Sequence, residues 1–192
     1  MTRPRLLFSC LALSLAAGAG GVARAAEKLP LTFPQGSEQP LAALQDIDVI
    51  EHLGDRVPAG LEFTDTAGQP VSLDTLTSAG KPVLVTLGYH RCPMLCSLVL
   101  DGLVKAAKAT GLAPGREFLA VDISIDPQED LTLAQGTQKR IVDAMGAKPA
   151  DWPFWVSTKD GGAAARRLAD AVGFRYKYDA QSKQFAHDAV AF

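Results

Sequence analysis

The fold is decided by residues 81–111, which read KPVLVTLGYHRCPMLCSLVLDGLVKAAKATG. Residues 82–87 form a short apolar run rich in β-branched side chains, which is typical of a strand buried on both faces. From Pro93 to Thr110 the apolar residues recur at helical spacing, and Gly111 ends the pattern. The stretch therefore predicts a buried strand that leads into a helix, with Cys92 and Cys96 at the junction.

The same alternation of strand and helix continues along the chain. Downstream we expect a strand over 117–125, a helix over 130–145, a strand over 152–157 and a helix over 160–172. Upstream, alternating residues flank the turn at 67–70, which predicts a hairpin over 61–73. At the other end, 174–178 and 184–192 predict a closing antiparallel hairpin.

This order of elements is that of an α/β, thioredoxin-like domain. We expect a central mixed sheet flanked by helices, with a β-hairpin before it and an antiparallel hairpin after it. The alternative is a flavodoxin-like sheet, whose last strands would be parallel with helices between them. The closing hairpin speaks against that alternative.

Composition limits the class of protein. With 192 residues, 47% of them hydrophobic and 21% charged, the chain has the balance of one globular domain. Its formal net charge is −2. A nucleic-acid partner is not expected, because the sequence shows no clustered basic surface.

The first residues predict export. Arg3 and Arg5 precede an apolar stretch over 6–17, and Ala23-Arg24-Ala25 forms a small-x-small cleavage site. We expect a signal peptide over 1–25, an extended lead-in over 26–47 and a periplasmic domain over 48–192. An uncleaved anchor would need about 20 apolar residues. Lipidation at Cys10 would leave 6–9 as the apolar region, which is too short for export.

Cleavage after Ala25 leaves two cysteines, Cys92 and Cys96, which are too few for a disulfide scaffold. Pro93 suits the first position of the helix, and Cys96 follows Cys92 by one turn, so both sulfurs can face the same side. The helix dipole favours anions there, and both thiols are expected to ionise more easily than free cysteine.

Three interpretations of this pair remain open: two buried core cysteines, a redox disulfide and a metal site. Oxidoreductases of this fold usually carry a proline opposite the motif, but residues 154–192 contain none. His187 lies in the corresponding segment, which favours a metal. A closed zinc site needs four ligands, whereas Cys92, Cys96 and His187 supply three, a set that suits Cu(I).

The other polar residues near the motif are more ambiguous. His90 is either an accessory ligand or, more simply, a solvent-facing residue, and His52 is expected on the surface. Asp126 is expected to cap the helix that follows it, with a second role in steadying the site as the alternative.

Several motifs resemble the Sco/SenC copper chaperones of cytochrome c oxidase assembly. They are Gly88-Tyr89-His90-Arg91-Cys92-Pro93-Met94-Leu95-Cys96, Ile125-Asp126-Pro127 with Glu129-Asp130, and Phe185-Ala186-His187. The resemblance implies a thioredoxin-like fold and copper held by Cys92, Cys96 and His187. It also implies delivery of copper to the CuA site of oxidase subunit II, a membrane-associated partner.

We therefore expect a periplasmic metallochaperone and not an enzyme. The alternative is a periplasmic thiol-disulfide oxidoreductase that uses Cys92 and Cys96. Family members continue through a full strand after the histidine. Since Phe192 is the last residue here, we expect a truncated domain with an incomplete last strand.

Overall fold

The computed structural model describes residues 46–92 and 95–192. The predicted signal peptide over 1–25, Cys10 and most of the lead-in lie outside these residues. Within the described residues, a five-stranded mixed sheet has the order β3-β2-β6-β5-β4. Its strands are β2 (Glu62–Asp65), β3 (Pro70–Ser72), β4 (Val83–Gly88), β5 (Leu119–Ser124) and β6 (Phe154–Val156). The predicted mixed sheet is confirmed.

The predicted hairpin over 61–73 forms one edge of this sheet. Strands β2 and β3 pair antiparallel, with Phe63 opposite Val71, and Gly68 in their turn adopts a φ of +80°. A positive φ is readily accepted by glycine. Strand β2 also pairs antiparallel with β6, whereas β6, β5 and β4 run parallel. A four-residue helix, α1 (Asp74–Thr77), follows the hairpin.

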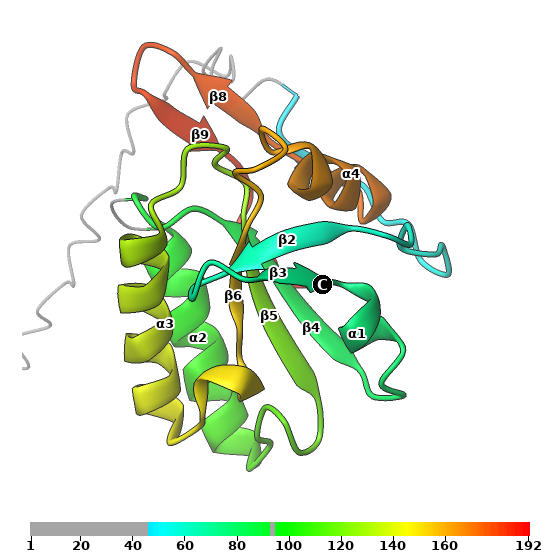
Figure 1. Ribbon diagram of the computed structural model, residues 1–192, viewed down its shortest axis with the longest axis vertical. Helices are drawn as coiled ribbons and strands as arrows, with labels where there is room; N and C mark the ends of the chain where they lie inside the picture. Colours follow the sequence, from blue (N-terminus) through cyan, green and yellow to red (C-terminus); the bar gives the residue numbers. More distant parts are fainter. Residues whose placement is uncertain (1–45, 93–94) are drawn as a thin grey trace, which may run out of the picture. The chain divides into compact units, whose positions relative to one another are not determined.

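Helices cover both faces of the parallel strands, as the apolar runs predicted (Figure 1). Helices α2 (Leu95–Thr110) and α3 (Leu131–Met145) pack side chains such as Leu100, Val104 and Ile141 against Ala120 of β5. Helix α4 (Ala163–Ala171) packs Leu168 on the other face, against a cluster that includes Val121 and Ile123. Successive residues of β5 thus enter two separate cores.

Helix α3 begins one residue after the predicted start at 130 and ends at the predicted residue 145. The side chain of Asp130 accepts a hydrogen bond from the backbone N–H of Thr132 at 2.7 Å, and Gly146 ends the helix with a φ of +65°. The capping role expected of Asp126 is therefore wrong, because Asp130 occupies that position. The strand expected over 152–157 is also shorter than predicted. A short 3-10 helix, η2 (Pro149–Asp151), precedes it and Trp152 caps that helix.

The closing hairpin is present, but its first half differs from the prediction. The strand expected over 174–178 divides at Tyr176 into β7 (Phe174–Arg175) and β8 (Lys177–Asp179). Strand β7 pairs with β1 (Asp48–Val49), and β8 pairs with β9 (Gln184–Ala186). Tyr176 is buried, and the Arg166 guanidinium lies 3.6 Å from the centre of its ring.

The last residues run beside the free edge of β4. Val85 and Phe192 exchange two backbone hydrogen bonds of 2.8 and 2.9 Å, and Ala191 forms an antiparallel bridge with Thr86. Because the two segments are antiparallel, the residues before Ala191 lie toward the carboxyl end of β4. The cysteine motif begins at that end.

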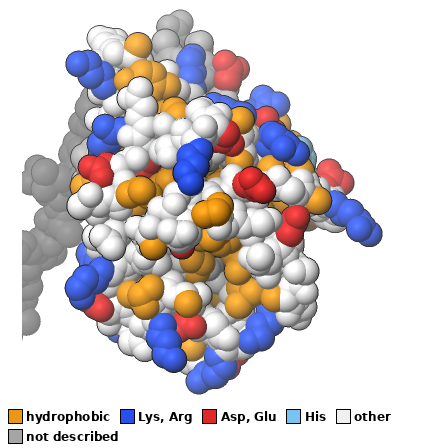
Figure 2. Space-filling view, in the orientation of Figure 1, with side chains coloured by type: hydrophobic (Ala, Val, Ile, Leu, Met, Phe, Trp, Pro, Cys, Tyr) orange, Lys and Arg blue, Asp and Glu red, His pale blue; other side chains and the backbone are white. Residues whose placement is uncertain are grey.

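The surface agrees with the balanced charge of the sequence. On the face drawn in Figure 2, the basic and acidic side chains of the described residues are interspersed with apolar ones. In the part of the chain that the structure describes, no helix has the length and apolar character needed to cross a membrane.

Candidate metal centre

Cys96 lies in the first turn of α2, where the chain leaves β4. The backbone N–H of Tyr89 donates to its Sγ at 3.5 Å. A Cβ placed on Gly88, the last residue of β4, would approach the same sulfur to 3.1 Å. Glycine at this position therefore lets the thiol lie directly against the end of the strand.

His187 reaches the same thiol from the far end of the chain. Its Nε2 lies 3.4 Å from Cys96 Sγ, and its Nδ1 lies 2.8 Å from the backbone oxygen of Asp188. A carbonyl oxygen can only accept, so Nδ1 carries the proton and Nε2 presents its lone pair to the sulfur. His187 is 9% exposed, and its ring packs near Tyr89 and Phe174. These contacts hold the imidazole in a single orientation.

Cys92 completes the group and is partly buried. It forms a hydrogen bond with Cys96 and another with the Tyr89 side chain. Burial raises the pKa of Tyr89 to about 12, and the neighbouring Cys92 adds to that effect. The structure thus brings Cys96 into contact with both other predicted ligands.

The three residues are not already arranged as a bound site. Among the described residues, no three His, Cys, Asp or Glu side chains form a group that could hold a metal ion as they stand. The ligand roles of Cys92, Cys96 and His187 stay predictions.

The expected ease of ionisation is wrong for Cys96. Burial raises the pKa of this thiol above its ordinary value, and the hydrogen bond from the Tyr89 N–H opposes that rise only in part. The free-energy cost of removing a thiolate from water is larger here than the stabilisation that the helix N-terminus provides. The protein without metal therefore holds Cys96 as a neutral thiol.

His90 is not solvent-facing, contrary to expectation. Its side chain is 2% exposed, its Nε2 lies 3.5 Å from Asp122 Oδ1, and its ring stacks on Phe154. Burial raises the pKa of Asp122, which also accepts a hydrogen bond from Thr86. His52, in contrast, is exposed as predicted.

The loop after β5 holds the cysteine loop in place. The Glu129 carboxylate accepts hydrogen bonds from the His90 backbone N–H at 2.7 Å and from the Ser124 hydroxyl at 2.8 Å. Beside it, Arg91 donates to Asp126 at 2.7 Å and to the Gln128 carbonyl at 2.9 Å. Asp126 thus contacts the cysteine loop through Arg91. Sequence reasoning missed Glu129 as a residue of the site, because no local pattern marks its contact with His90.

A family comparison accounts for this combination of fold and cysteine loop. The sequence model of the SCO1/SenC family matches residues 52–148. The chain belongs to the SCO1/SenC family. The match includes Cys92 and Cys96 but ends before His187, so the place of the histidine rests on the structure. No curated protein matches the chain significantly.

Solved structures support the same fold. A candidate electron transfer protein of Aquifex aeolicus VF5 is 26% identical, with a TM-score of 0.60 over 72% of this chain and 76% of that one. A SCO1/SenC family lipoprotein of Bacillus anthracis is 17% identical, with a TM-score of 0.53 over 72% and 77%. Arabidopsis thaliana ScoI with copper bound is 18% identical, with a TM-score of 0.52 over 71% and 80%. The thioredoxin-like prediction is confirmed.

Proposed function

We propose that this protein is a periplasmic copper chaperone that delivers copper to the CuA site of cytochrome c oxidase subunit II. The observation that carries the proposal is the 3.4 Å contact between Cys96 Sγ and His187 Nε2, with Cys92 beside them. Membership of the SCO1/SenC family and the copper held by the Arabidopsis relative support it.

The donor set suits a soft ion in a site of low coordination number. Two sulfurs and one imidazole match Cu(I), whereas structural zinc takes four ligands. Metal binding replaces the thiol protons, and the charge of the ion offsets the cost of burying the Cys96 sulfur as a thiolate. The Asp188 carbonyl holds His187 with Nε2 free to coordinate. Three ligands leave a side from which a recipient can take the ion.

The action proposed is binding and transfer, not turnover. Cys92 and Cys96 contact each other, so a thiol-disulfide oxidoreductase is the second candidate. Both functions need the two sulfurs. They differ in their need for His187, because imidazole takes no part in forming a disulfide.

Export is part of the proposal. Export directed by residues 1–25 would carry the domain to the periplasm, where it could meet the proposed recipient. N-terminal sequencing of periplasmic protein should begin at Ala26. Protein that remains in the cytoplasm with its first residues attached would contradict this part of the proposal.

Copper loading tests the function directly. The reduced exported protein should bind one Cu(I) ion and pass it to the purified apo CuA domain of subunit II. Cys96→Ser should bind none with high affinity, whereas Ser97→Ala, a matched change at the next position of α2, should bind as the parent does. A parent protein that retains no copper against a weak competing chelator would refute the proposal.

A further inference from the structure

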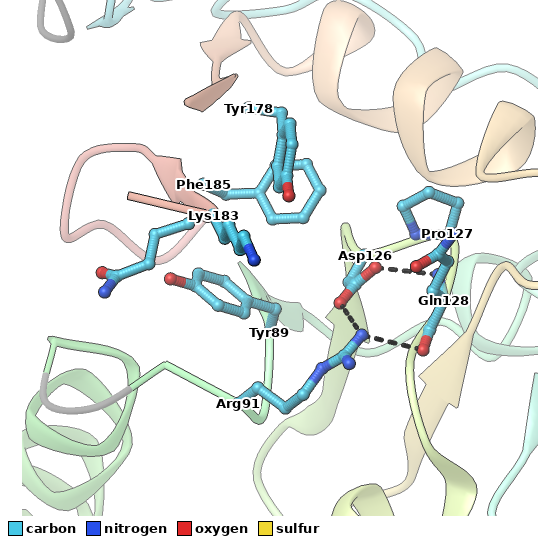
Figure 3. A pocket seen from close by; sticks show the side chains of 9 residues that line it. Tyr89, Arg91, Asp126, Pro127, Gln128, Tyr178, Lys183 and Phe185 are labelled. Atoms are coloured by element: carbon cyan, nitrogen blue, oxygen red, sulfur yellow. Dashed lines mark hydrogen bonds and ion pairs between the residues drawn. The ribbon is translucent and has the colours of Figure 1, made fainter. Parts of the chain in front are cut away.

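A pocket of about 570 Å³ opens between the cysteine loop and the β8–β9 hairpin (Figure 3). Its walls come from three segments distant in sequence: the cysteine loop, the loop after β5 and the β8–β9 hairpin. Residues that define its character are Tyr89, Arg91, Asp126, Tyr178, Lys183 and Phe185. Its volume falls within the range of ligand-binding pockets, about 300–1,000 Å³.

One wall of the pocket is aromatic. The ring centres of Phe185 and Tyr89 lie 5.4 Å apart, and those of Phe185 and Tyr178 lie 5.1 Å apart. Tyr178 is 51% exposed, so its ring offers apolar surface to solvent. Exposed aromatic side chains beside a hollow are typical of protein contact surfaces.

The lining also carries charged side chains, with an excess of positive charge. Arg91 and Asp126 form an ion pair in which the Arg91 side chain stays 48% exposed. The amino group of Lys183 points into the pocket in Figure 3, and no ion pair of Lys183 occurs among the described residues. The lining thus holds two cations and one carboxylate, and only Arg91 is paired with that carboxylate. A second carboxylate, brought by a partner, would balance the charge.

Tyr89 joins this pocket to the proposed copper site. Its ring lines the pocket, its hydroxyl bonds with Cys92, and its backbone N–H donates to Cys96. Tyr89 itself is buried, so a segment seated in the pocket would lie beside the residue that contacts both thiols.

We propose that this pocket docks an acidic segment of the copper recipient, with its carboxylate on Lys183 and Arg91 and an apolar side chain against Tyr178 and Phe185. The inference rests on the proposed function, because it assigns the pocket to the same recipient. It adds to that function a surface that places the recipient and speeds transfer without holding copper.

Transfer kinetics separate docking from copper binding. The exported protein, loaded with Cu(I), is mixed with the apo CuA domain of subunit II at low and high salt. Lys183→Glu and Tyr178→Ser should bind copper as the parent does. Lys183→Glu should slow transfer by about threefold to tenfold at low salt and less at high salt, because steering between charges is screened. Lys105→Glu makes the same charge change on the exposed side of α2 and should transfer at the parent's rate.

The outcomes distinguish the two proposals. If the parent transfers copper and both pocket variants transfer it at the same rate, the pocket assignment is wrong and the copper function stands. If Lys105→Glu slows transfer as much as Lys183→Glu, general charge explains the effect and the assignment is also wrong. If the loaded parent delivers nothing to this domain, the recipient is wrong and the pocket assignment fails with it.

A lipid headgroup is the alternative occupant that a basic, aromatic pocket could bind. Binding of the parent to phosphatidylglycerol vesicles that Lys183→Glu abolishes, with transfer unchanged, would assign the pocket to a headgroup and overturn the proposal.

Discussion

Cys96 Sγ and His187 Nε2 lie 3.4 Å apart although 91 residues separate them in the chain. The contact depends on the pairing of Thr86 with Ala191, which aligns the last residues with β4. Cys96 approaches from the helix after that strand and His187 from the segment beside it. One strand thus positions both sides of the site.

Gly88 should control the geometry of the thiol. Gly88→Ala would bring a Cβ to 3.1 Å from Cys96 Sγ and displace the sulfur from the strand end. We expect Cu(I) affinity, measured by competition with a chromophoric chelator, to fall by about tenfold, as for other residues that orient metal ligands.

Gly102→Ala provides the control, since a Cβ there meets nothing within 4 Å. It should bind copper as tightly as the parent. Equal affinity of Gly88→Ala and the parent would show that the contact with Gly88 does not position the sulfur.

The reduced, metal-free protein should lose stability at alkaline pH. Burial raises the pKa of Cys96, so the unfolded chain releases this proton near pH 8.5 while the folded chain keeps it. The contribution of the neutral Cys96 thiol to the free energy of unfolding is fully present below about pH 8.5. It falls by about 1 kcal/mol by pH 9.5. Urea unfolding at several pH values measures it.

Cys96→Ser should lose this part of the pH dependence. Tyr89 adds little in this range, because the unfolded chain releases the phenol proton only near pH 10 and the folded chain keeps it to about pH 12. If the free energy of unfolding falls with pH equally in the parent and in Cys96→Ser, Cys96 titrates as an ordinary thiol and the explanation is wrong.

Gly173 should be essential to the packing of the first described strand. Its φ is +73°, and a Cβ would lie 1.7 Å from the Ile50 carbonyl oxygen. Gly173→Ala should therefore destabilise the fold by at least about 1–3 kcal/mol, from backbone strain alone. Gly136→Ala, inside α3 with open space around it, should stabilise by up to about 1 kcal/mol. Thermal unfolding of the two variants should shift in opposite directions, and equal shifts would contradict this explanation.

Local signals predicted much of the fold. Asp130 and Gly146 mark the ends of α3, and the turn near Gly68 marks the hairpin of β2 and β3. Strand β1 has two residues, too few to show alternation. The division at Tyr176 was also invisible, because both halves alternate and only their pairing partners differ.

The site was predictable where the chain is continuous and less so where loops meet. The position of Cys92 and Cys96 followed from the strand-to-helix junction. The side chain of His90 is buried, and the His90 backbone N–H contacts Glu129, which lies 39 positions further along the chain. No periodic pattern in the sequence predicts a contact between such distant residues. The raised pKa of Cys96 depends on side chains from the whole end of the sheet, whereas the sequence showed only the helix terminus.

His187→Ala in a strain that lacks this protein tests the central claim most directly. Cys92 and Cys96 should still form and release a disulfide, because imidazole is not part of that reaction, while Cu(I) binding weakens severely. If the protein delivers copper, the variant should fail to restore oxidase activity, and added copper should restore part of it by mass action. His52→Ala, a change at an exposed histidine, should restore activity fully. Oxidase assembly with His187→Ala equal to that with the parent would contradict the copper account and leave the thiol-disulfide function in its place.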